Sequence, residues 1–295
     1  MNTSEQKCGC GKSNELVSLT IKNDNRNECQ SRGETAVNPI AVKRNFVIGA
    51  IETPAGTIPR IATRLEGADY LGAVKVRWGI NRSNYRIEPG LYAVGSPTDR
   101  SDVFVTANYK LTFDIVRKNL AGINAWLMVL DTKGINVWCA AGKGTFGTKE
   151  LVNRIQLTLL EKIVQHRRII LPQLGAVGVA AHQVKDATGF TVLYGPVRAS
   201  DIAMYVQAGY KTTKEMRRVR FGWADRIKLV PNDFIYNLRY LVILLALFFI
   251  LSGIHADGFS LRQASTKVSF LFTIILAGYL SGVVLTPLLL PYLFF

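Results

Sequence analysis

Two long uncharged runs of apolar residues near the C-terminus constrain the fold of this 295-residue chain most strongly. Tyr240–Ile254 holds fifteen residues without a charge, and it reaches about twenty if it begins at residue 235 and Arg239 snorkels to an interface. Val268–Phe295 is a run of 28 uncharged residues. Because a helix needs roughly twenty apolar residues to cross a membrane, we predict membrane-spanning helices over 235–254 and 268–292. The second is longer than needed or kinked at Pro287.

A pair of buried core helices is the alternative, although core helices seldom run so far without a polar face.

Positive charge gathers immediately before the first of these runs. The chain has 36 Lys and Arg against 21 Asp and Glu, and residues 211–228 alone hold seven basic and two acidic residues. Contact with anionic lipid headgroups explains this cluster. No zinc-finger, RNP-type or basic-helix motif accompanies it, so nucleic acid is not an expected partner. The positive-inside rule places residues 1–230 in the cytoplasm and the loop 255–267 on the far side. Residues 1–22 show no signal-peptide pattern. We therefore expect a multi-pass protein of the cytoplasmic (inner) membrane with its soluble domain facing the cytoplasm.

The rest of the chain divides by composition. With 48% apolar and only 19% charged residues, it is neither wholly disordered nor collagen-like. Its N-terminal part is polar and rich in Asn and Ser, and it contains Cys8, Cys10 and Cys29. Three thiols fall short of a four-ligand zinc or cluster site, so we interpret them as reduced cytoplasmic thiols. The expected organisation is a flexible polar tail (1–35), an α/β domain (36–210), a basic juxtamembrane linker (211–234) and a membrane domain (235–295).

Strand-like and helix-like segments alternate between residues 102 and 208. The patterns predict strands at Val103–Tyr109, Ala125–Asp131, Arg168–Leu171 and Thr191–Tyr194, and helices at Leu111–Leu120, Thr148–Val164, Gly178–Thr188 and Ala199–Ala208. Upstream, Phe46–Ile51 and Ala73–Trp78 look like strands. This alternation indicates a Rossmann-like parallel sheet with helices on its faces. Ligands of such sheets bind beyond the carboxyl ends of the strands, so we expect the site in the loops after Tyr109, Asp131, Leu171 and Tyr194.

The segment between Asp131 and Lys149 carries the most informative motif. Gly142-Lys143 suggests a P-loop, but the required earlier Gly and following Ser or Thr are absent. We predict instead a short helix over 137–141, with Asn136 as N-cap and Gly142 as left-handed C-cap. Cys139 lies within it, beside small alanines that would let a flat ligand approach the backbone. An inert core cysteine is the alternative.

Asn136–Lys143 (NVWCAAGK) resembles the cap-helix motif of the corrinoid proteins of microbial mercury methylation, the HgcA family. The similarity extends through Val103–Tyr109, Gly144–Thr148 and Tyr194–Ala199, which resemble the corrinoid domain that this family shares with the large subunit of the corrinoid iron–sulfur protein. It covers about residues 46–254. The family places a cytoplasmic corrinoid domain before a membrane domain that usually has more spans than the two seen here. The sequence is therefore a short member or is truncated within the membrane domain.

The resemblance implies that Cys139 is the catalytic residue and binds the cobalt of a cobalamin-type corrinoid from its lower face. Hg(II) is a soft electrophile that receives a methyl group together with its bonding electrons. A thiolate opposite the methyl group stabilises the Co(III) left behind, and coordination keeps the thiol deprotonated. The implied activity is methyl transfer from cobalt to Hg(II), which forms methylmercury. The implied corrinoid contacts are Asn136, Val137, Trp138, Ala140, Ala141, Gly142, Lys143, Thr145, Thr106, Asn108, Gly195, Pro196 and Arg198.

Several of these contacts have a second interpretation. Asn136 caps the helix and is positioned to tune the sulfur. Trp138 is either a core anchor or a contact of the corrin ring. Lys143 and Arg198 either bind the periphery of the corrin or are ordinary solvated side chains.

The implied cycle requires partners. Carbanion transfer leaves Co(III), while a methyl cation from a methylated folate-type donor is accepted by Co(I), so two low-potential electrons are needed each turnover. The resemblance implies a ferredoxin-like subunit with two 4Fe–4S clusters as reductant. Two other functions stay open: a corrinoid methyl carrier of one-carbon metabolism that does not act on mercury, and a non-enzymatic membrane scaffold or transporter subunit. The N-terminal thiols are a further candidate for passing Hg(II) inward.

Overall fold

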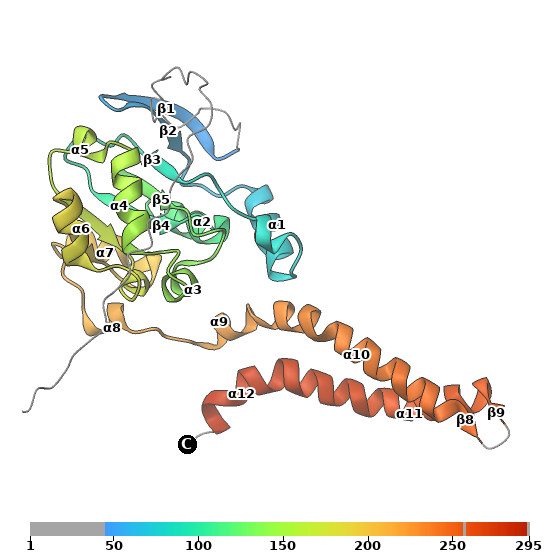
Figure 1. Cartoon of the computed structure of the whole chain (residues 1–295). Helices are drawn as coiled ribbons and strands as arrows, with labels where there is room; N and C mark the ends of the chain where they lie inside the picture. Colours follow the sequence, from blue (N-terminus) through green and yellow to red (C-terminus); the bar gives the residue numbers. More distant parts are fainter. Residues whose placement is uncertain (1–44, 256–257, 294–295) are drawn as a thin grey trace, which may run out of the picture. The chain divides into compact units, whose positions relative to one another are not determined.

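The computed structural model describes residues 45–255 and 258–293. By internal contacts the chain divides into Met1–Thr35 and Ala36–Phe295. The predicted flexible tail and its cysteines, Cys8, Cys10 and Cys29, lie outside the described residues. The fold below therefore concerns the second unit (Figure 1).

A seven-stranded mixed sheet forms the centre of the α/β domain, with strand order β1-β2-β3-β5-β4-β6-β7. The strands are β1 (Val47–Thr53), β2 (Gly56–Ile61), β3 (Gly90–Val94), β4 (Val103–Ala107), β5 (Ala125–Leu130), β6 (Arg168–Leu171) and β7 (Thr191–Tyr194). Strands β5, β4, β6 and β7 run parallel, as predicted for these four strands. The sheet as a whole is not parallel, because β3 pairs antiparallel with β5 and β1 pairs antiparallel with β2.

Helices cover both faces of this sheet. The helices of the α/β domain are α1 (Gly67–Arg77), α2 (Lys110–Asn119), α3 (Val137–Gly142), α4 (Thr148–Leu157), α5 (Leu160–Ile163), α6 (Ala181–Thr188) and α7 (Ile202–Gln207), of which α1 lies beside the sheet (Figure 1). Strand β5 shows how the faces divide: Leu127 and Val129 join a core with Phe113 of α2, while Met128 joins a second core with Leu151 of α4. Side chains of a strand alternate between faces, so a wholly apolar strand such as β5 must be covered on both sides.

Three predicted elements differ in the structure. Ala73–Trp78 is not a strand but lies in α1, whose first turn is capped where the Glu66 N–H donates to Asp69 Oδ2 (3.0 Å). The single helix expected over 148–164 is broken at Leu159, which adopts a left-handed conformation (φ 47°) and separates α4 from α5. The helix expected from Gly178 begins at Ala181, after a 3₁₀ turn η2 (Gln173–Gly175). In each case the element differs because of local backbone geometry, which the spacing of apolar residues does not predict.

A buried charge network fixes α1 to α2. Arg117 is fully buried, and its guanidinium donates to Asp114 (2.8 Å) and Asp69 (2.7 Å). Lys110 bridges the same two carboxylates at 2.6 Å each. Two cations and two carboxylates thus neutralise one another, which is the arrangement that lets charges be buried. Helix α1 is therefore attached to α2 through ion pairs of its polar side chain Asp69.

The C-terminal part contains two helices long and apolar enough to cross a membrane, judged by length and composition: Trp223–Gly253 and Leu261–Leu289. Its elements are α8 (Lys214–Arg217), α9 (Trp223–Ile227), α10 (Val230–Gly253), β8 (Ile254–His255), β9 (Gly258–Phe259), α11 (Leu261–Leu280), a π-helical turn η4 (Ser281–Leu285) and α12 (Thr286–Leu293). Helices α10 and α11 pack side by side, with the rings of Phe234 and Tyr279 5.3 Å apart.

The boundaries of these helices differ from the predicted ones. The first begins at Val230, with proline in its first turn, rather than at residue 235. The second begins at Leu261 because Ser260 caps it, so Arg262 and Lys267 lie in the helix and not in a thirteen-residue loop. The irregularity expected at Pro287 takes the form of the π-helical turn η4 just before it.

Candidate functional site

The order of the strands predicts where a ligand binds. The chain passes from β4 through α2 to β5 on one side, then crosses to β6 on the other side of β4. Strands β4 and β6 pair at a single register position, Phe104 with Ile170. Beyond that position the two strands are no longer paired, and their carboxyl ends leave a crevice. Such a switch point is the usual ligand site of open α/β sheets.

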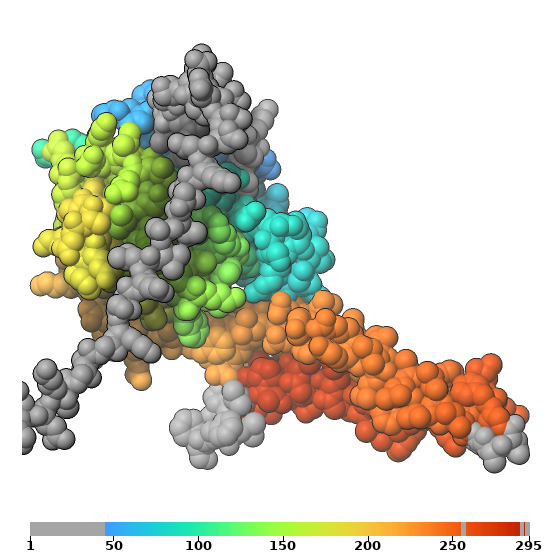
Figure 2. All heavy atoms as spheres, in the orientation of Figure 1, coloured from blue at the N-terminus to red at the C-terminus, as the bar shows by residue number. Residues whose placement is uncertain are grey.

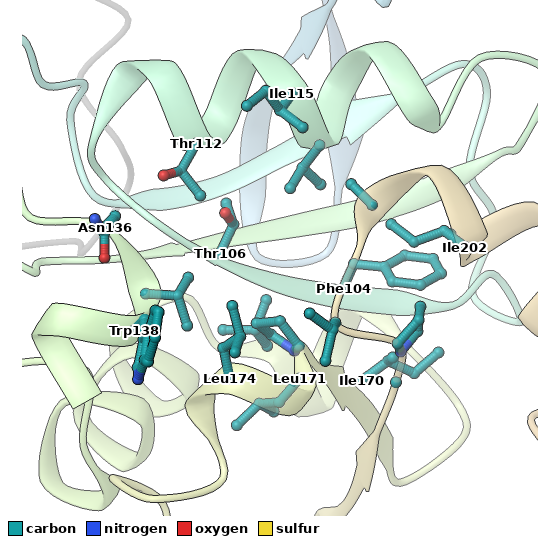
Figure 3. Close-up of a pocket in the computed structure, with 18 residues that line it drawn as sticks. Phe104, Thr106, Thr112, Ile115, Asn136, Trp138, Ile170, Leu171, Leu174 and Ile202 are labelled. Carbon is teal, nitrogen blue, oxygen red and sulfur yellow. The ribbon is translucent and has the colours of Figure 1, made fainter. Parts of the chain in front are cut away.

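A cavity of about 300 Å³ occupies this crevice. It lies between the carboxyl ends of β4 and β6, under α2, and beside the start of α3, as Figure 3 shows. Its walls are mostly apolar, with a few polar groups among them. The lining residues used below are Thr106, Thr112, Asn136, Val137, Trp138, Leu174, Gly195 and Pro196. A concave, mainly apolar cavity with few polar groups has the composition of a small-molecule site.

Thr106 is the polar group that the fold leaves unsatisfied. It is fully buried on β4, and its Oγ1 has no hydrogen-bond partner among the described residues. In Figure 3 it lies on the cavity wall below Thr112 of α2. A buried hydroxyl without a partner costs about 1–3 kcal/mol, so its presence in the wall favours a bound group that supplies the missing hydrogen bond.

Helix α3 confirms the predicted cap at its N-terminus. Oδ1 of Asn136 accepts a hydrogen bond from the backbone N–H of Cys139 at 2.9 Å. The predicted C-cap is wrong: Gly142 remains helical, the cap residue is Lys143, and the left-handed glycine is Gly144 (φ 78°). The helix is one residue longer than expected because Lys143 N–H still reaches the Cys139 carbonyl oxygen (3.1 Å).

The two faces of α3 have different tasks. Val137, Ala140 and Ala141 are buried against the sheet. Cys139, Gly142 and Lys143 are exposed. Cys139 is therefore not an inert core cysteine, the alternative interpretation of a cysteine among apolar residues. A Cβ built on Gly142 would meet nothing within 4 Å, so packing does not require glycine there. Cys139 and Gly142 are three residues apart and share one face of the helix, which leaves the thiol on an open surface without a bulky neighbour at 142.

Close backbone contacts hold α3 in place. A Cβ on Gly178 would lie 2.1 Å from the carbonyl oxygen of Phe146 and 3.1 Å from Cα of Ala141. One on Gly175 would lie 2.5 Å from the Phe146 ring. The loop after β6 can approach the end of α3 this closely only because these residues lack side chains.

Asn108 holds the loop before α3. Its Oδ1 accepts from the backbone N–H groups of Thr132 (3.1 Å) and Gly134 (2.9 Å), and its Nδ2 donates to Asp131 (3.1 Å). Burial raises the pKa of Asp131, but hydrogen bonds from Lys133 and Asn108 outweigh it, so this pKa lies below its usual range. Asn108, predicted as a ligand contact, does not line the cavity, because its side chain joins the loops after β4 and β5.

The other predicted site residues separate into two groups. Asn136, Val137, Trp138, Thr106, Gly195 and Pro196 line the cavity, and Trp138 is exposed at its edge rather than anchored in the core. Thr145 lies after α3 and donates to the Ala140 carbonyl oxygen (3.4 Å). Arg198 is exposed and pairs with Asp225 (2.9 Å), and its guanidinium also donates to the Arg220 carbonyl oxygen. The structure therefore gives Arg198 neighbours from the juxtamembrane segment and no place in the cavity wall.

Sequence reasoning missed several residues of the wall, most of them apolar. Thr112 and Ile115 come from the first turns of α2, Leu174 from η2 and Ile202 from α7. Each follows the carboxyl end of a parallel strand, so the strand prediction could have identified these positions. Among the described residues, no group of three or more His, Cys, Asp and Glu could hold a metal ion.

Comparison with known proteins identifies the domain that contains this site. Residues 74–206 match the family described as CO dehydrogenase/acetyl-CoA synthase delta subunit (CdhD). The chain is 34% identical over 128 residues to the acetyl-CoA decarbonylase/synthase complex subunit gamma of Methanopyrus kandleri, covering 43% of this chain and 27% of that protein. It is 33% identical over 125 residues to the corrinoid/iron-sulfur protein large subunit of Moorella thermoacetica, covering 42% and 28%. Residues 74–206 form a CdhD family domain.

The CdhD family domain contains the cavity, α3 and Cys139, and leaves out β1, β2 and the two long apolar helices. It is related to the corrinoid/iron-sulfur protein large subunit. The chain spans about a quarter of the length of the curated relatives it matches (27% for the gamma subunits of Methanopyrus kandleri and Archaeoglobus fulgidus).

Proposed function

We propose that this chain is a membrane-attached corrinoid protein that takes part in methyl transfer, with Hg(II) as the acceptor substrate and Cys139 as the lower ligand of the corrinoid cobalt. The observation that carries the proposal is the exposed Cys139 on a capped helix at the switch point of a CdhD family domain. Similarity to a corrinoid/iron-sulfur protein large subunit supports the cofactor class, and the NVWCAAGK motif supports the more specific reaction.

The residues present fit a large flat cofactor. Gly142 leaves space on the same face as the Cys139 thiol, and the buried Thr106 hydroxyl lacks a partner. The cavity of about 300 Å³ is at the small end for ligand sites, too small for a whole corrin ring system. A corrinoid would accordingly lie over the open face of α3, with only a part of it entering the cavity. Asn136, Trp138 and Gly195 would then contact it at the rim.

Each group of the chain has a defined task in this proposal. When bound, the corrinoid would supply a cobalt centre that carries a methyl group. The Cys139 thiolate would donate negative charge to the metal, which favours release of the methyl group with its bonding electrons to a soft acceptor such as Hg(II). Asn136 fixes the turn that bears the sulfur, since its side chain accepts the N–H of Cys139 itself. Trp138, exposed beside the cavity, would shield one edge of the bound group from water.

The proposal includes partners and a location. The described residues offer no cluster of metal ligands that could carry electrons, so a separate ferredoxin-like subunit with 4Fe–4S clusters would supply them. A methylated folate-type compound, or the methyltransferase that uses it, would supply the methyl group. The two long apolar helices would attach the chain to the cytoplasmic membrane as a multi-pass protein, with the basic segment 211–228 on the cytoplasmic side.

Absorption spectra of the purified 295-residue chain, produced with cobalamin, test the cofactor and its ligand. We expect bound cobalt and a spectrum that changes in Cys139→Ala and in Cys139→His, because the axial ligand differs. Cys29→Ala is the matched control and should leave the spectrum unchanged. Absence of cobalt, or an identical spectrum in Cys139→Ala, contradicts the proposal.

A single-turnover assay then tests the acceptor. The chain loaded with a methylated corrinoid is mixed with Hg(II), and methylmercury is measured. A corrinoid methyl carrier of one-carbon metabolism is the second candidate function, favoured by the similarity to subunits of acetyl-CoA decarbonylase/synthase complexes. That function predicts bound cobalt but no methylmercury, whereas the primary proposal predicts both.

A further inference from the structure

Helix α1 presents its apolar face to the solvent. Tyr70, Leu71, Val74 and Trp78 are each about half exposed, between 44% and 55%, and Ile80 just after the helix is 58% exposed. With 3.6 residues per turn, positions 70, 74 and 78 form one stripe, and position 71 lies beside it. In Figure 2, α1 is the cyan projection on the edge of the α/β domain. A stripe of large apolar side chains on a soluble surface usually marks an interaction site.

The inward face of α1 is the less apolar one. Val76 is the one fully buried apolar residue of the helix. Asp69 faces the domain too, where Lys110 and Arg117 bind it at 2.6 and 2.7 Å. Gly72 lies against the Tyr85 hydroxyl and has no room for a side chain. Because an ordinary surface helix buries its apolar stripe, this reversed arrangement is not explained by packing within the domain.

Basic residues border the exposed stripe on both sides. At about 100° per residue, Lys75 falls on one edge of the stripe and Arg77 on the other. Lys75 is exposed and Arg77 is half-buried, and Arg64 and Arg82 at the two ends of the segment are exposed as well. Tyr70 and Trp78 supply the amphipathic aromatic rings that favour a membrane–water interface. Apolar stripe, basic edges and aromatic residues together are the features of a helix that lies in a lipid surface.

We propose that α1 lies on the surface of a bilayer that contains anionic lipids, with Tyr70, Leu71, Val74 and Trp78 in the headgroup region and Lys75 and Arg77 on the lipid phosphates. The inference rests on the membrane attachment in the proposed function and goes beyond it, since it assigns α1 of the α/β domain a contact with the lipid in addition to that of the two long apolar helices. The lipid is the favoured occupant because both edges of the stripe are positive, which matches an anionic headgroup layer.

Depth-dependent fluorescence quenching of the 295-residue chain in vesicles tests the proposed contact between α1 and the lipid. The vesicles are phosphatidylcholine with roughly a third phosphatidylglycerol, with and without brominated acyl chains. The starting variant is Trp138→Phe/Trp223→Phe, which leaves Trp78 and the buried Trp126 as tryptophans. The Trp78 signal is the difference between this variant and the same variant with Trp78→Phe. We expect brominated lipid to lower that signal about twofold or more, and aqueous iodide to leave it nearly unchanged.

Charge reversal provides the matched comparison. Lys75→Glu/Arg77→Glu should abolish the quenching by brominated lipid, while Lys162→Glu/Lys185→Glu, which reverses two exposed charges on α5 and α6, should not. A Trp78 signal that iodide quenches and brominated lipid does not overturns the proposal, as does a signal shielded from both, which would indicate a protein covering the stripe. Flotation of the chain with vesicles distinguishes a failure of membrane attachment from a failure of the α1 contact alone. A chain that does not float with vesicles contradicts membrane attachment and this proposal together, whereas a floating chain with Trp78 in water contradicts the α1 contact alone.

Discussion

The backbone N–H of Cys139 donates a hydrogen bond of 2.9 Å to Oδ1 of Asn136, three residues earlier. This bond makes the residue that caps α3 also the residue that orients the thiol-bearing turn. Losing a side-chain cap costs about 1 kcal/mol of stability. We expect Asn136→Ala to lower the free energy of unfolding by this amount and to weaken corrinoid retention, because the Cys139 turn frays. Thermal unfolding followed by near-ultraviolet circular dichroism measures the first effect, and cobalt content the second. Asn136→Asp keeps the cap and should stay close to the wild type in stability; equal losses in both variants would contradict a capping role.

Substitutions at Gly142 test whether the exposed face of α3 binds a ligand. Its Cβ would stand in open space and its backbone is helical, so Gly142→Ala should raise stability by up to about 1 kcal/mol through helix propensity. Gly142→Leu should fold equally well but lose most bound corrinoid, because a large side chain would stand beside the Cys139 thiol. Lys149→Leu, an exposed position on α4, is the control for an added apolar side chain. Undiminished cobalt content in Gly142→Leu would mean that no flat ligand lies on this face.

Thr106 should respond in opposite ways with and without the cofactor. Its buried hydroxyl has no partner in the described chain, so Thr106→Val should stabilise the cofactor-free protein by about 1 kcal/mol or more. If the hydroxyl bonds the bound group, the same variant should release corrinoid faster. Thr106→Ser, which keeps the hydroxyl, should retain the cofactor better than Thr106→Val. Dialysis followed by cobalt analysis measures how much corrinoid each variant retains. If Thr106→Ser releases corrinoid faster than Thr106→Val, the Thr106 hydroxyl does not contact the ligand.

The parallel half of the sheet could be predicted because its signals are local. Each of β4, β5, β6 and β7 is a short apolar run followed by a turn and a helix, and this pattern is typical of parallel sheets. Strand β3, Gly90–Val94, is as buried as β4, yet no alternation or hairpin turn marks it. Its antiparallel pairing with β5 depends on a partner about 35 residues away, and pairing at that separation leaves no local signal.

Helix α1 was missed for a different reason. The run AVKVRW alternates between apolar and charged residues, which favours a strand. The same segment also carries apolar residues at positions 70, 71, 74 and 78, a spacing that fits a helix, so its sequence pattern does not choose between strand and helix. At the site, the motif predicted Asn136 and Cys139, and the resemblance predicted Thr106, Gly195 and Pro196; all of these except Cys139 line the cavity. Asn108 and Arg198, which the resemblance also predicted, lie outside the cavity wall and hydrogen-bond to Asp131 and Asp225, partners that spacing alone does not reveal.

Asp69 should make stability depend on acid pH. Burial raises its pKa, but the hydrogen bonds from Lys110 and the Glu66 backbone and the charges of Lys110 and Arg117 outweigh it, so the pKa lies below the ordinary 3.8. Stabilisation from such a lowered pKa is fully present above pH 3.8 and is lost as pH falls through the folded-state value. We expect Asp69→Asn to lower the free energy of unfolding at pH 7 by roughly 3 kcal/mol, since Arg117 is buried. The same variant should lose less of its free energy of unfolding than the wild type as the pH falls below 3.8. Thermal midpoints between acid and neutral pH, with Asp186→Asn of exposed α6 as control, decide this; parallel curves for Asp69→Asn and wild type would contradict it.

Gly178 tests whether close packing of the loop after β6 positions α3. An alanine Cβ would lie 2.1 Å from the Phe146 carbonyl oxygen, a backbone atom that cannot rotate away, and 3.1 Å from Cα of Ala141. Either the loop or the end of α3 must shift, so Gly178→Ala should destabilise the domain by about 2 kcal/mol or more, in the range of overpacked cores. Because Ala141 is two residues from Cys139, the shift should also reduce cobalt retention. Gly67→Ala adds the same methyl group in open space at the start of α1, away from α3, and is the matched control. If both variants unfold at the same temperature and hold equal cobalt, the placement of α3 does not depend on this contact.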